Sequence, residues 1–252
     1  MTDFCIVIPA RWQSSRLPGK PLLEIAGKPL LQRVCERASA ANAAQLVVAT
    51  DDERIEAAVN AWGYQVVMTE VKHESGSDRV AEVAAKMGWS DEQIIVNVQG
   101  DEPLIDPAAI QQVAKNLADN VAAGIATLCS PLSDASELAD PNAVKVVTDN
   151  QGLALYFSRA PIPWNRDAGA GNLQLARRHI GIYAYRVAAL KSITGLAVAD
   201  IERSESLEQL RAMAVGIRIH VEDACADTGP GVDTQADLLA VASLLEKANL
   251  SE

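Results

Sequence analysis

Short apolar runs alternate with stretches of helical periodicity along the first half of the chain. Continuous apolar runs bounded by turn residues are typical of strands buried on both faces of a sheet. Four such runs occur, at residues 4–8, 45–50, 65–69 and 94–99. Between the first two, apolar side chains keep helical spacing over residues 30–38. Strands that alternate with helices of this length predict an α/β fold with a doubly wound, mostly parallel sheet.

The second half alternates less regularly. Further strands are expected at 125–129, 141–147, 153–158, 179–186 and 217–221, and helices at 108–117, 133–138, 206–215 and 236–248. Residues 165–177 are rich in Gly, Ala and Asn and are interpreted as a mobile loop. This loop is the best candidate for a break between a larger core and a smaller lobe.

The run at 179–186 alternates in polarity. As a strand it would have one polar face and one apolar face. The polar face would carry His179, Gly181, Tyr183 and Tyr185, and the apolar face Ile180, Ile182 and Ala184. Two interpretations fit equally well: a strand that lines a cleft, and a half-buried strand whose tyrosines face solvent.

Composition narrows the class of protein. The chain has 252 residues, of which 49% are hydrophobic and 22% charged, and its formal net charge is −11. This acidic balance argues against general binding to nucleic acids or anionic membranes. No apolar run approaches the roughly 20 residues of a membrane helix, so a cytoplasmic protein is expected. The four cysteines are scattered without a CxxC pair, which indicates core residues rather than disulfides or zinc ligands.

The loop after the first strand is cationic. Pro9 is expected to end that strand because proline cannot donate to the sheet ladder. Arg11, Arg16 and Lys20 follow, within a segment (11–37) of six basic and two acidic side chains. Ligands of open α/β sheets bind at the carboxyl ends of the strands, so a triphosphate is a natural candidate. A solvated basic loop is an equally good interpretation on charge alone, because neither a Walker motif nor a GxGxxG motif is present.

Carboxylates lie at two other strand and helix boundaries. Asp101 follows the run at 94–99, where Mg²⁺ could bridge the protein and a triphosphate. Glu102 precedes Pro103 and is expected to face away. Asp233 lies in a Gly-rich turn before the last helix, which it could simply cap. Lys28, just before Pro29 and a helix, is expected to be a surface residue.

Several segments together resemble one enzyme family. These are PAR (9–11), SRLPGKPL (15–22), SGSDR (75–79), VNVQGDEPL (96–104), YFSRAPIPW (156–164), HIGIYAYR (179–186), ESLEQLR (205–211) and GVDT (231–234). They resemble, in order, the motifs of the CMP-Kdo synthetase family (3-deoxy-manno-octulosonate cytidylyltransferases). The residues of SGSDR alone favour an ordinary Ser-capped helix start, but the whole set covers nearly the entire chain and is specific.

The resemblance implies a set of site residues. It implies nucleotide contacts from Ala10, Arg11, Ser15, Arg16, Lys20, Ser75, Gly76, Ser77, Arg79, Gln99 and Gly100. It implies sugar-acid contacts from Gln99, Arg159, His179, Tyr183, Glu208 and Gln209. Asp101 and Asp233 would hold the metal, and Arg16, Lys20 and Asp101 would be catalytic.

The implied reaction is transfer of CMP from CTP to Kdo with release of pyrophosphate, dependent on Mg²⁺, for lipopolysaccharide synthesis. The implied fold is a Rossmann-like nucleotide-diphospho-sugar transferase, a single domain over 1–252, in a homodimer. Residues 1–130 with 217–252 would form mainly the nucleotide-binding core, and 131–216 mainly a sugar-acid and dimerisation lobe. Two alternatives remain: a cytidylyltransferase for a sialic acid or an amino variant of Kdo, and a nucleotide-binding regulator without turnover.

Overall fold

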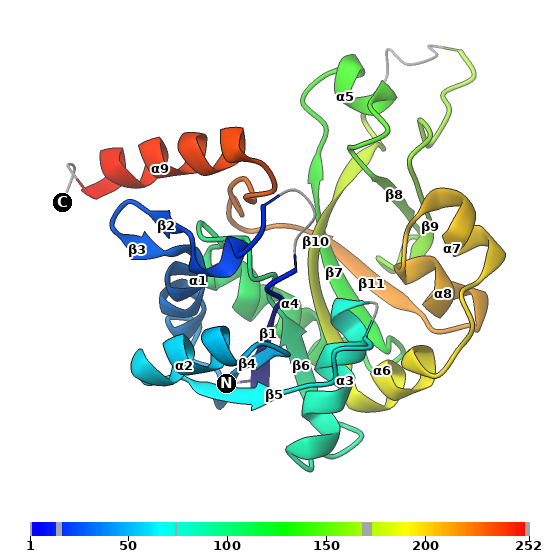
Figure 1. The fold of residues 1–252 in the computed structure, drawn as a ribbon. Coiled ribbons are helices and arrows are strands. Elements are labelled where there is room, and N and C mark those ends of the chain that lie inside the picture. Colours follow the sequence, from blue (N-terminus) through cyan, green and yellow to red (C-terminus); the bar gives the residue numbers. More distant parts are fainter. Residues whose placement is uncertain (1, 14–16, 74, 168–172, 250–252) are drawn as a thin grey trace.

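A mixed sheet forms the centre of the molecule. The computed structural model describes residues 2–13, 17–73, 75–167 and 173–249. The main path of the sheet runs β11 (Ile219–Asp223), β7 (Ile125–Pro131), β10 (Arg177–Arg186), β6 (Ile94–Asn97), β1 (Phe4–Ala10), β4 (Gln45–Thr50) and β5 (Gln65–Met68). The strands β6, β1, β4 and β5 are parallel, as are β7 and β11, while β10 is antiparallel to both of its neighbours in this path. The expected α/β fold with a mostly parallel sheet is confirmed (Figure 1).

Helices cover both faces of the sheet. On one face pack α1 (Leu30–Ser39), α2 (Glu53–Ala61) and α4 (Pro107–Asp119), and on the other α3 (Gly76–Lys86), α6 (Val187–Thr194) and α8 (Gln209–Ala214). Strand β1 shows why its sequence is continuously apolar. Ile6 and Ile8 enter the first core, Val7 enters the second, and all three are fully buried.

Strand β1 is longer than expected, because it continues through Pro9 to Ala10. Its ladder with β6 ends at the pair Val7 and Asn97, whereas its ladder with β4 continues to Ala10. Alternate residues of a parallel strand direct their amides to the same neighbour, so Pro9 faces the side where β6 has already ended. The missing amide donor therefore costs no ladder bond.

The helix expected at 206–215 is shorter than predicted, at Gln209–Ala214, and a helix that was not expected precedes it. Helix α7 (Asp200–Glu205) ends at Ser206, which adopts the left-handed conformation with φ of 52°. Helix α8 then begins at Gln209. The resulting turn brings Glu208 and Gln209 toward the carboxyl end of β6.

The segment 131–216 does not form a separate unit. Strands β8 (Lys145–Thr148) and β9 (Ala154–Ser158) extend the sheet from β10, and α5 (Ala135–Ala139) lies beyond them (Figure 1). Val146 and Phe157 of these strands share one hydrophobic core with Val7 and Val47. A smaller lobe is therefore not distinguished from the core, and the proposed division of labour stays a prediction.

A second, small sheet and the last helix complete the fold. The hairpin of β2 (Glu24–Ile25) and β3 (Lys28–Pro29) packs beside α9 (Gln235–Asn249) (Figure 1). Leu17, Ile25, Val232 and Val241 form the apolar contact between them. This contact holds the loop after β1 against the turn before α9. Among the described residues, no helix is both long and apolar enough to cross a membrane.

Candidate active site

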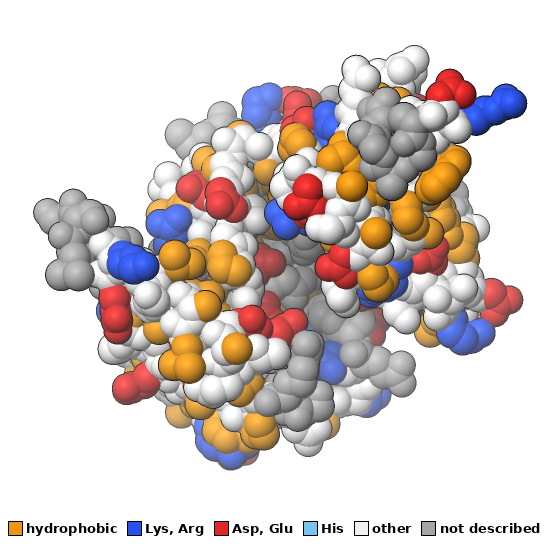
Figure 2. All heavy atoms as spheres, turned by 90° about the horizontal axis from the view of Figure 1, so that it is seen from above, with side chains coloured by type: hydrophobic (Ala, Val, Ile, Leu, Met, Phe, Trp, Pro, Cys, Tyr) orange, Lys and Arg blue, Asp and Glu red, His pale blue; other side chains and the backbone are white. Residues whose placement is uncertain are grey.

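The side chain of Lys20 joins three segments that are far apart in the sequence. Its Nζ donates to Asp101 Oδ2 at 2.7 Å, to the Val232 carbonyl at 2.9 Å and to Asp233 Oδ1 at 3.3 Å. The Lys20 side chain is only 14% exposed, so this ammonium is largely withdrawn from solvent. The two carboxylates expected to share a site thus converge on one cation. Seen from above, the surface is hollowed near the middle of the molecule, with acidic side chains beside the hollow (Figure 2).

Trp12 fixes the backbone just before Lys20. Gly19, with φ of +69°, donates its amide to the Trp12 carbonyl at 3.1 Å. A Cβ on Gly19 would lie 3.0 Å from the Trp12 ring, so the close approach requires glycine. The Arg54 guanidinium lies 3.4 Å from the centre of that ring and is paired with Asp52, the N-cap of α2. The loop is therefore braced by α2.

The turn before α9 leaves Asp233 available to Lys20. Asp237 accepts the amides of Asp233 and Thr234, at 3.0 and 2.7 Å, and the Thr234 hydroxyl accepts the Asp237 amide at 3.2 Å. This reciprocal cap between Thr234 and Asp237 begins α9. The Val232 amide also donates to the Asp101 carbonyl at 2.9 Å, which ties the turn to the loop after β6.

Glu102 is enclosed beside Asp101 rather than directed into solvent. No described residue bonds to its Oε2. Burial, together with the negative charge of Asp101, raises the pKa of Glu102 to about 8. Glu102 is therefore mainly neutral near pH 7 and adds little negative charge next to the two aspartates.

A cavity of about 170 Å³ opens between the ends of β6 and β10. Six of its lining residues were predicted as site residues: Gly76, Ser77, Gln99, Tyr183, Glu208 and Gln209. The other four are Asn97, Ile125, Tyr185 and Ile193. Asn97 was not predicted, although it is the single polar residue within the apolar run 94–98. Tyr185 was predicted to share a strand face with Tyr183 but not to belong to the site.

The start of α3 lies beside Glu208 in this cavity, because Ser77 and Glu208 both line it. Ser75 caps α3 in a reciprocal bond with Asp78, as the alternative interpretation expected. Burial raises the pKa of Glu208, while the nearby hydroxyls of Ser77 and Ser75 and the charge of Arg211 act in the opposite direction. The segment 75–79, expected to contact the base, thus lies next to a residue expected to contact the sugar acid.

The side chain of Arg79 is occupied inside the protein, and its contact with a nucleotide stays a prediction. Its side chain has no exposed surface and pairs with Asp51 Oδ2 at 2.7 Å and Thr69 Oγ1 at 2.5 Å. Burial, and secondly the charge of Arg79, lowers the pKa of Arg11. Arg79 therefore joins the end of β4 to the end of β5 beneath the protein surface. Arg11 lies near this buried charge.

Arg159 and His179 do not line the cavity. The Arg159 guanidinium donates to the carbonyls of Glu205, Pro141 and Ser206 at 2.7, 2.8 and 3.3 Å. It thus holds the turn that precedes Glu208. His179 Nε2 lies 2.9 Å from Thr127 Oγ1, and burial lowers the pKa of His179 to about 3, so its ring is neutral near pH 7.

The other predicted residues that the structure describes lie at the end of β1, in the loop after β6 and on the surface. Ala10 is buried at the end of β1, and a Cβ on Gly100 would lie 2.7 Å from the Pro9 carbonyl, so these two loops touch. Lys28 pairs with Glu36 on the surface, as expected. Ser15 and Arg16 lie outside the described residues.

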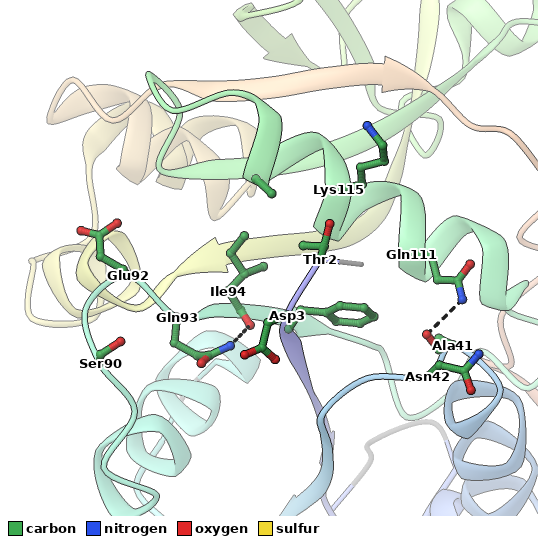
Figure 3. A pocket seen from close by; sticks show the side chains of 12 residues that line it. Thr2, Asp3, Ala41, Asn42, Ser90, Glu92, Gln93, Ile94, Gln111 and Lys115 are labelled. Atoms are coloured by element: carbon green, nitrogen blue, oxygen red, sulfur yellow. Dashed lines mark hydrogen bonds between the residues drawn. The ribbon is translucent and has the colours of Figure 1, made fainter.

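A larger cavity of about 890 Å³ lies at the opposite, amino-terminal edge of β1 and β6 (Figure 3). Two of its amides are already used inside the protein: Gln93 donates to the Ile94 carbonyl and Gln111 to the Ala41 carbonyl. Since ligands of open α/β sheets bind at the carboxyl ends of the strands, the site around Lys20 is the candidate active site.

The fold and the site define a nucleotide-binding α/β enzyme with a cationic loop facing paired carboxylates. Residues 5–219 match the family model described as cytidylyltransferase, so the chain belongs to the cytidylyltransferase family and is a nucleotidyltransferase.

Three relatives that the chain resembles over nearly its whole length have the same enzyme name. The chain is 54% identical to a 3-deoxy-manno-octulosonate cytidylyltransferase of Cellvibrio japonicus, over 97% of this chain and 98% of that protein. It is 56% identical to the enzyme of the same name from Alcanivorax borkumensis, over 94% and 96% of the two chains. The relative of that name in Pseudomonas syringae is 54% identical, over 96% and 98%.

Solved structures agree. A CMP:2-keto-3-deoxy-manno-octonic acid synthetase complexed with CTP superimposes with a TM-score of 0.90 at 48% identity, covering 98% of this chain and 99% of that one. A cytidylyltransferase from Leptospira borgpetersenii, at 17% identity over 98% and 87% of the two chains, has a TM-score of 0.64 and shares the fold.

Proposed function

We propose that this protein transfers CMP from CTP to 3-deoxy-manno-octulosonate (Kdo), giving CMP-Kdo and pyrophosphate. The observation that carries the proposal is the convergence of Lys20, Asp101 and Asp233 beside a cavity lined by Gln99 and Glu208. The names of the relatives, at 54 and 56% identity over nearly the whole chain, and the CTP bound to a similar enzyme support it.

The chemistry follows from the site. The anomeric hydroxyl of the sugar attacks the α-phosphorus of CTP, a P–O bond forms to the sugar, and the P–O bond to pyrophosphate breaks. Arg11, Arg16 and Lys20 neutralise the phosphates. The loops after β1 and β6 hold CTP and the sugar hydroxyl in line for the transfer. Catalysis of this kind consists mostly of positioning and stabilisation of charge.

The donor set around Lys20 also fits Mg²⁺. Asp101 and Asp233 already share one cationic group, which shows that both carboxylates can reach a single positive centre. The described residues contain no group of three or more His, Cys, Asp or Glu that could form an all-protein site. Two carboxylates completed by phosphate oxygens are what Mg²⁺ typically takes. When bound, the ion would neutralise phosphate charge and help to orient the nucleophile.

The sugar acid would occupy the cavity between β6 and β10. Gln99, Tyr183, Glu208 and Gln209 would contact it directly. Arg159 supports the turn before Glu208 and still has guanidinium hydrogens with which to approach an acid group.

We also infer a cytoplasmic homodimer that supplies CMP-Kdo for lipopolysaccharide assembly. Exposed apolar side chains within 131–216 favour self-association through that part of the chain. They include Leu155, Leu196, Val198 and Ile201, all at least 38% exposed.

Pyrophosphate release with CTP and a panel of sugar acids tests the proposal. We expect turnover with Kdo that exceeds turnover with a sialic acid and with an amino variant of Kdo. Preference for one of the other two acids would assign the alternative substrate. CTP binding without turnover of any of the three would assign a regulator.

A further inference from the structure

Strand β8 begins with a lysine that the protein encloses completely. Lys145 has no exposed surface. Its Nζ donates to the carbonyl of Arg159 at 2.7 Å and to the carbonyl of Asp140 at 2.8 Å. An enclosed ammonium group is less favourable than an apolar side chain of the same length, because it loses its hydration. Filling this space would not need a charge, whereas holding two carbonyls needs a strong donor.

The bonds of Lys145 continue through the side chain of Arg159. The guanidinium of Arg159 donates to the carbonyls of Glu205 and Ser206 at 2.7 and 3.3 Å. Those two carbonyls belong to the end of α7 and to the left-handed residue that follows it. Lys145 thus binds the backbone of Arg159, and Arg159 in turn binds the turn that leads to Glu208. The printed sequence places 60 residues between the first and the third member of this chain of contacts, Lys145 and Glu205.

The carboxylate of Glu205 also holds the backbone of Arg159. It accepts the Ser158 hydroxyl at 2.7 Å, the Arg159 amide at 2.9 Å and the Tyr156 hydroxyl at 3.3 Å. Burial acts to raise the pKa of Glu205, but these three bonds and the charge of Arg159 lower it below the usual value. Glu205 is therefore ionised near pH 7. Lys145 fixes the carbonyl of Arg159, and Glu205 fixes its amide.

We propose that Lys145 is a positioning residue for the sugar acid, and that it acts through Arg159 on the turn between α7 and α8. This inference rests on the proposed function and deepens it. The turn precedes Glu208 and Gln209, which line the cavity expected to hold the sugar acid. Lys145 itself touches no substrate, because it has no exposed surface. Its effect reaches the cavity only through the residues that it holds.

Steady-state kinetics of Lys145→Met, with pyrophosphate release as the readout, tests the proposal. Methionine fills a similar space without a donor. We expect KM for Kdo to rise by about tenfold, as for the loss of one hydrogen bond from a charged donor, with KM for CTP unchanged. No change in KM for Kdo, or an equal rise for both substrates, would overturn the assignment.

Arg186→Met is the matched control. Arg186 also donates to two backbone carbonyls, those of Ala123 and Leu117, from a side chain that is only 18% exposed. It lies beside Ile94, at the amino-terminal end of β6 and away from the turn between α7 and α8. We expect its KM for Kdo to stay at the wild-type value. An equal rise in the two variants would show a general effect of lost packing and contradict the proposal.

A double substitution tests the path through Arg159. Adding Lys145→Met to Arg159→Ala should raise KM for Kdo little further, because both residues act on the same turn. Effects that multiply would show that Lys145 acts by another path and would refute this one.

Amide hydrogen exchange of the protein without substrate separates this inference from the proposed function. Residues 205–209 should exchange faster in Lys145→Met than in wild type, while α1 should exchange at the wild-type rate. Faster exchange throughout the chain would show general loss of stability and refute a positioning role. If Lys145→Met does not fold, Lys145→Gln is measured in the same way. Wild-type protein that releases no pyrophosphate from CTP and Kdo would refute the proposed function, whereas faster exchange confined to the turn would still support the contacts of Lys145.

Discussion

Lys20 and Asp101 are 81 residues apart in the chain and form an ion pair of 2.7 Å. The same ammonium group reaches Asp233 at 3.3 Å. Lys20 thus occupies the place where positive charge is needed between two carboxylates. A triphosphate that arrives at this loop would compete with both aspartates for the lysine, so substrate binding and rearrangement of this cluster are coupled.

Lys20 and Lys28 both lie in a Gly-Lys-Pro-Leu segment, at 19–22 and 27–30, but their substitutions should have very different effects. Lys20→Ala removes the cation that joins three segments, and we expect turnover to fall by about 100-fold or more, as for other groups that stabilise charge in transfer reactions. Lys28→Ala removes a pair with Glu36 in which both side chains are more than a third exposed, and should change turnover little. Pyrophosphate release by the two variants decides the matter. Equal losses, with circular dichroism unchanged, would contradict the assignment.

Arg159 should act through the several N–H donors of its planar guanidinium group and not through its charge alone. We expect Arg159→Ala to raise KM for Kdo more than KM for CTP, because the turn before Glu208 loses the two bonds that the guanidinium donates to the Glu205 and Ser206 carbonyls. Arg159→Lys should be nearly as defective, since one ammonium cannot reproduce that geometry. Kinetics that vary each substrate in turn provide the test. Full recovery by the lysine variant would show that a simple charge contact with the substrate dominates.

Gly100 should tolerate no side chain, because a Cβ would lie 2.7 Å from the Pro9 carbonyl. We expect Gly100→Ala to lower the free energy of unfolding by about 1–3 kcal/mol, the usual cost of overpacking, and to lower turnover by displacing Asp101. Gly181→Ala is the control, because a Cβ there meets no atom within 4 Å. Urea titrations of both variants give the comparison. Similar midpoints would show that the loop adjusts without strain.

Acid should destabilise the protein partly through Glu82. Burial acts to raise its pKa, but hydrogen bonds from Lys86, the Glu70 amide and His73 lower the pKa of Glu82 to about 2, from 4.5 in an unperturbed glutamate. A depressed carboxyl pKa gives stability that is present above pH 4.5 and is lost as pH falls toward 2. Its size is at most about 3 kcal/mol.

Glu82→Gln should therefore flatten the fall in stability between pH 4.5 and pH 2. The control is Glu70→Gln, whose side chain is 55% exposed and pairs with Lys72 at the surface. Chemical denaturation across this range is the measurement. An identical slope for wild type and Glu82→Gln would exclude Glu82 as a source of acid sensitivity.

Local pattern predicts this fold well where burial is uniform. The continuously apolar sequence of β1 reports that both of its faces are covered, and β4 follows the same rule. Pattern fails where a long-range contact decides. Nothing near Ser206 in the sequence marks the left-handed turn that divides α7 from α8, because Arg159 of another segment stabilises it.

The same contrast between local sequence and long-range contacts holds for the candidate active site. Motif resemblance identifies Lys20, Asp101 and Asp233 individually, but their meeting depends on the packing of α9 against the hairpin β2–β3. Arg79 lies in a motif and yet is buried, because Asp51 at the end of β4 accepts its charge. Such pairings depend on strand order, which local sequence does not encode.

The central claim is that Asp101 and Asp233 act together with Mg²⁺ in CMP transfer. The most direct measurement is pyrophosphate release from CTP and Kdo as a function of Mg²⁺ concentration, for wild type, Asp101→Asn, Asp233→Asn and the surface control Asp119→Asn. We expect wild type and the control to respond alike. Asp101→Asn should show no turnover at any Mg²⁺ concentration, and Asp233→Asn nearly none, because an amide brings no charge to the ion. Near-normal turnover by Asp233→Asn, or turnover by wild type without any divalent cation, would contradict the claim.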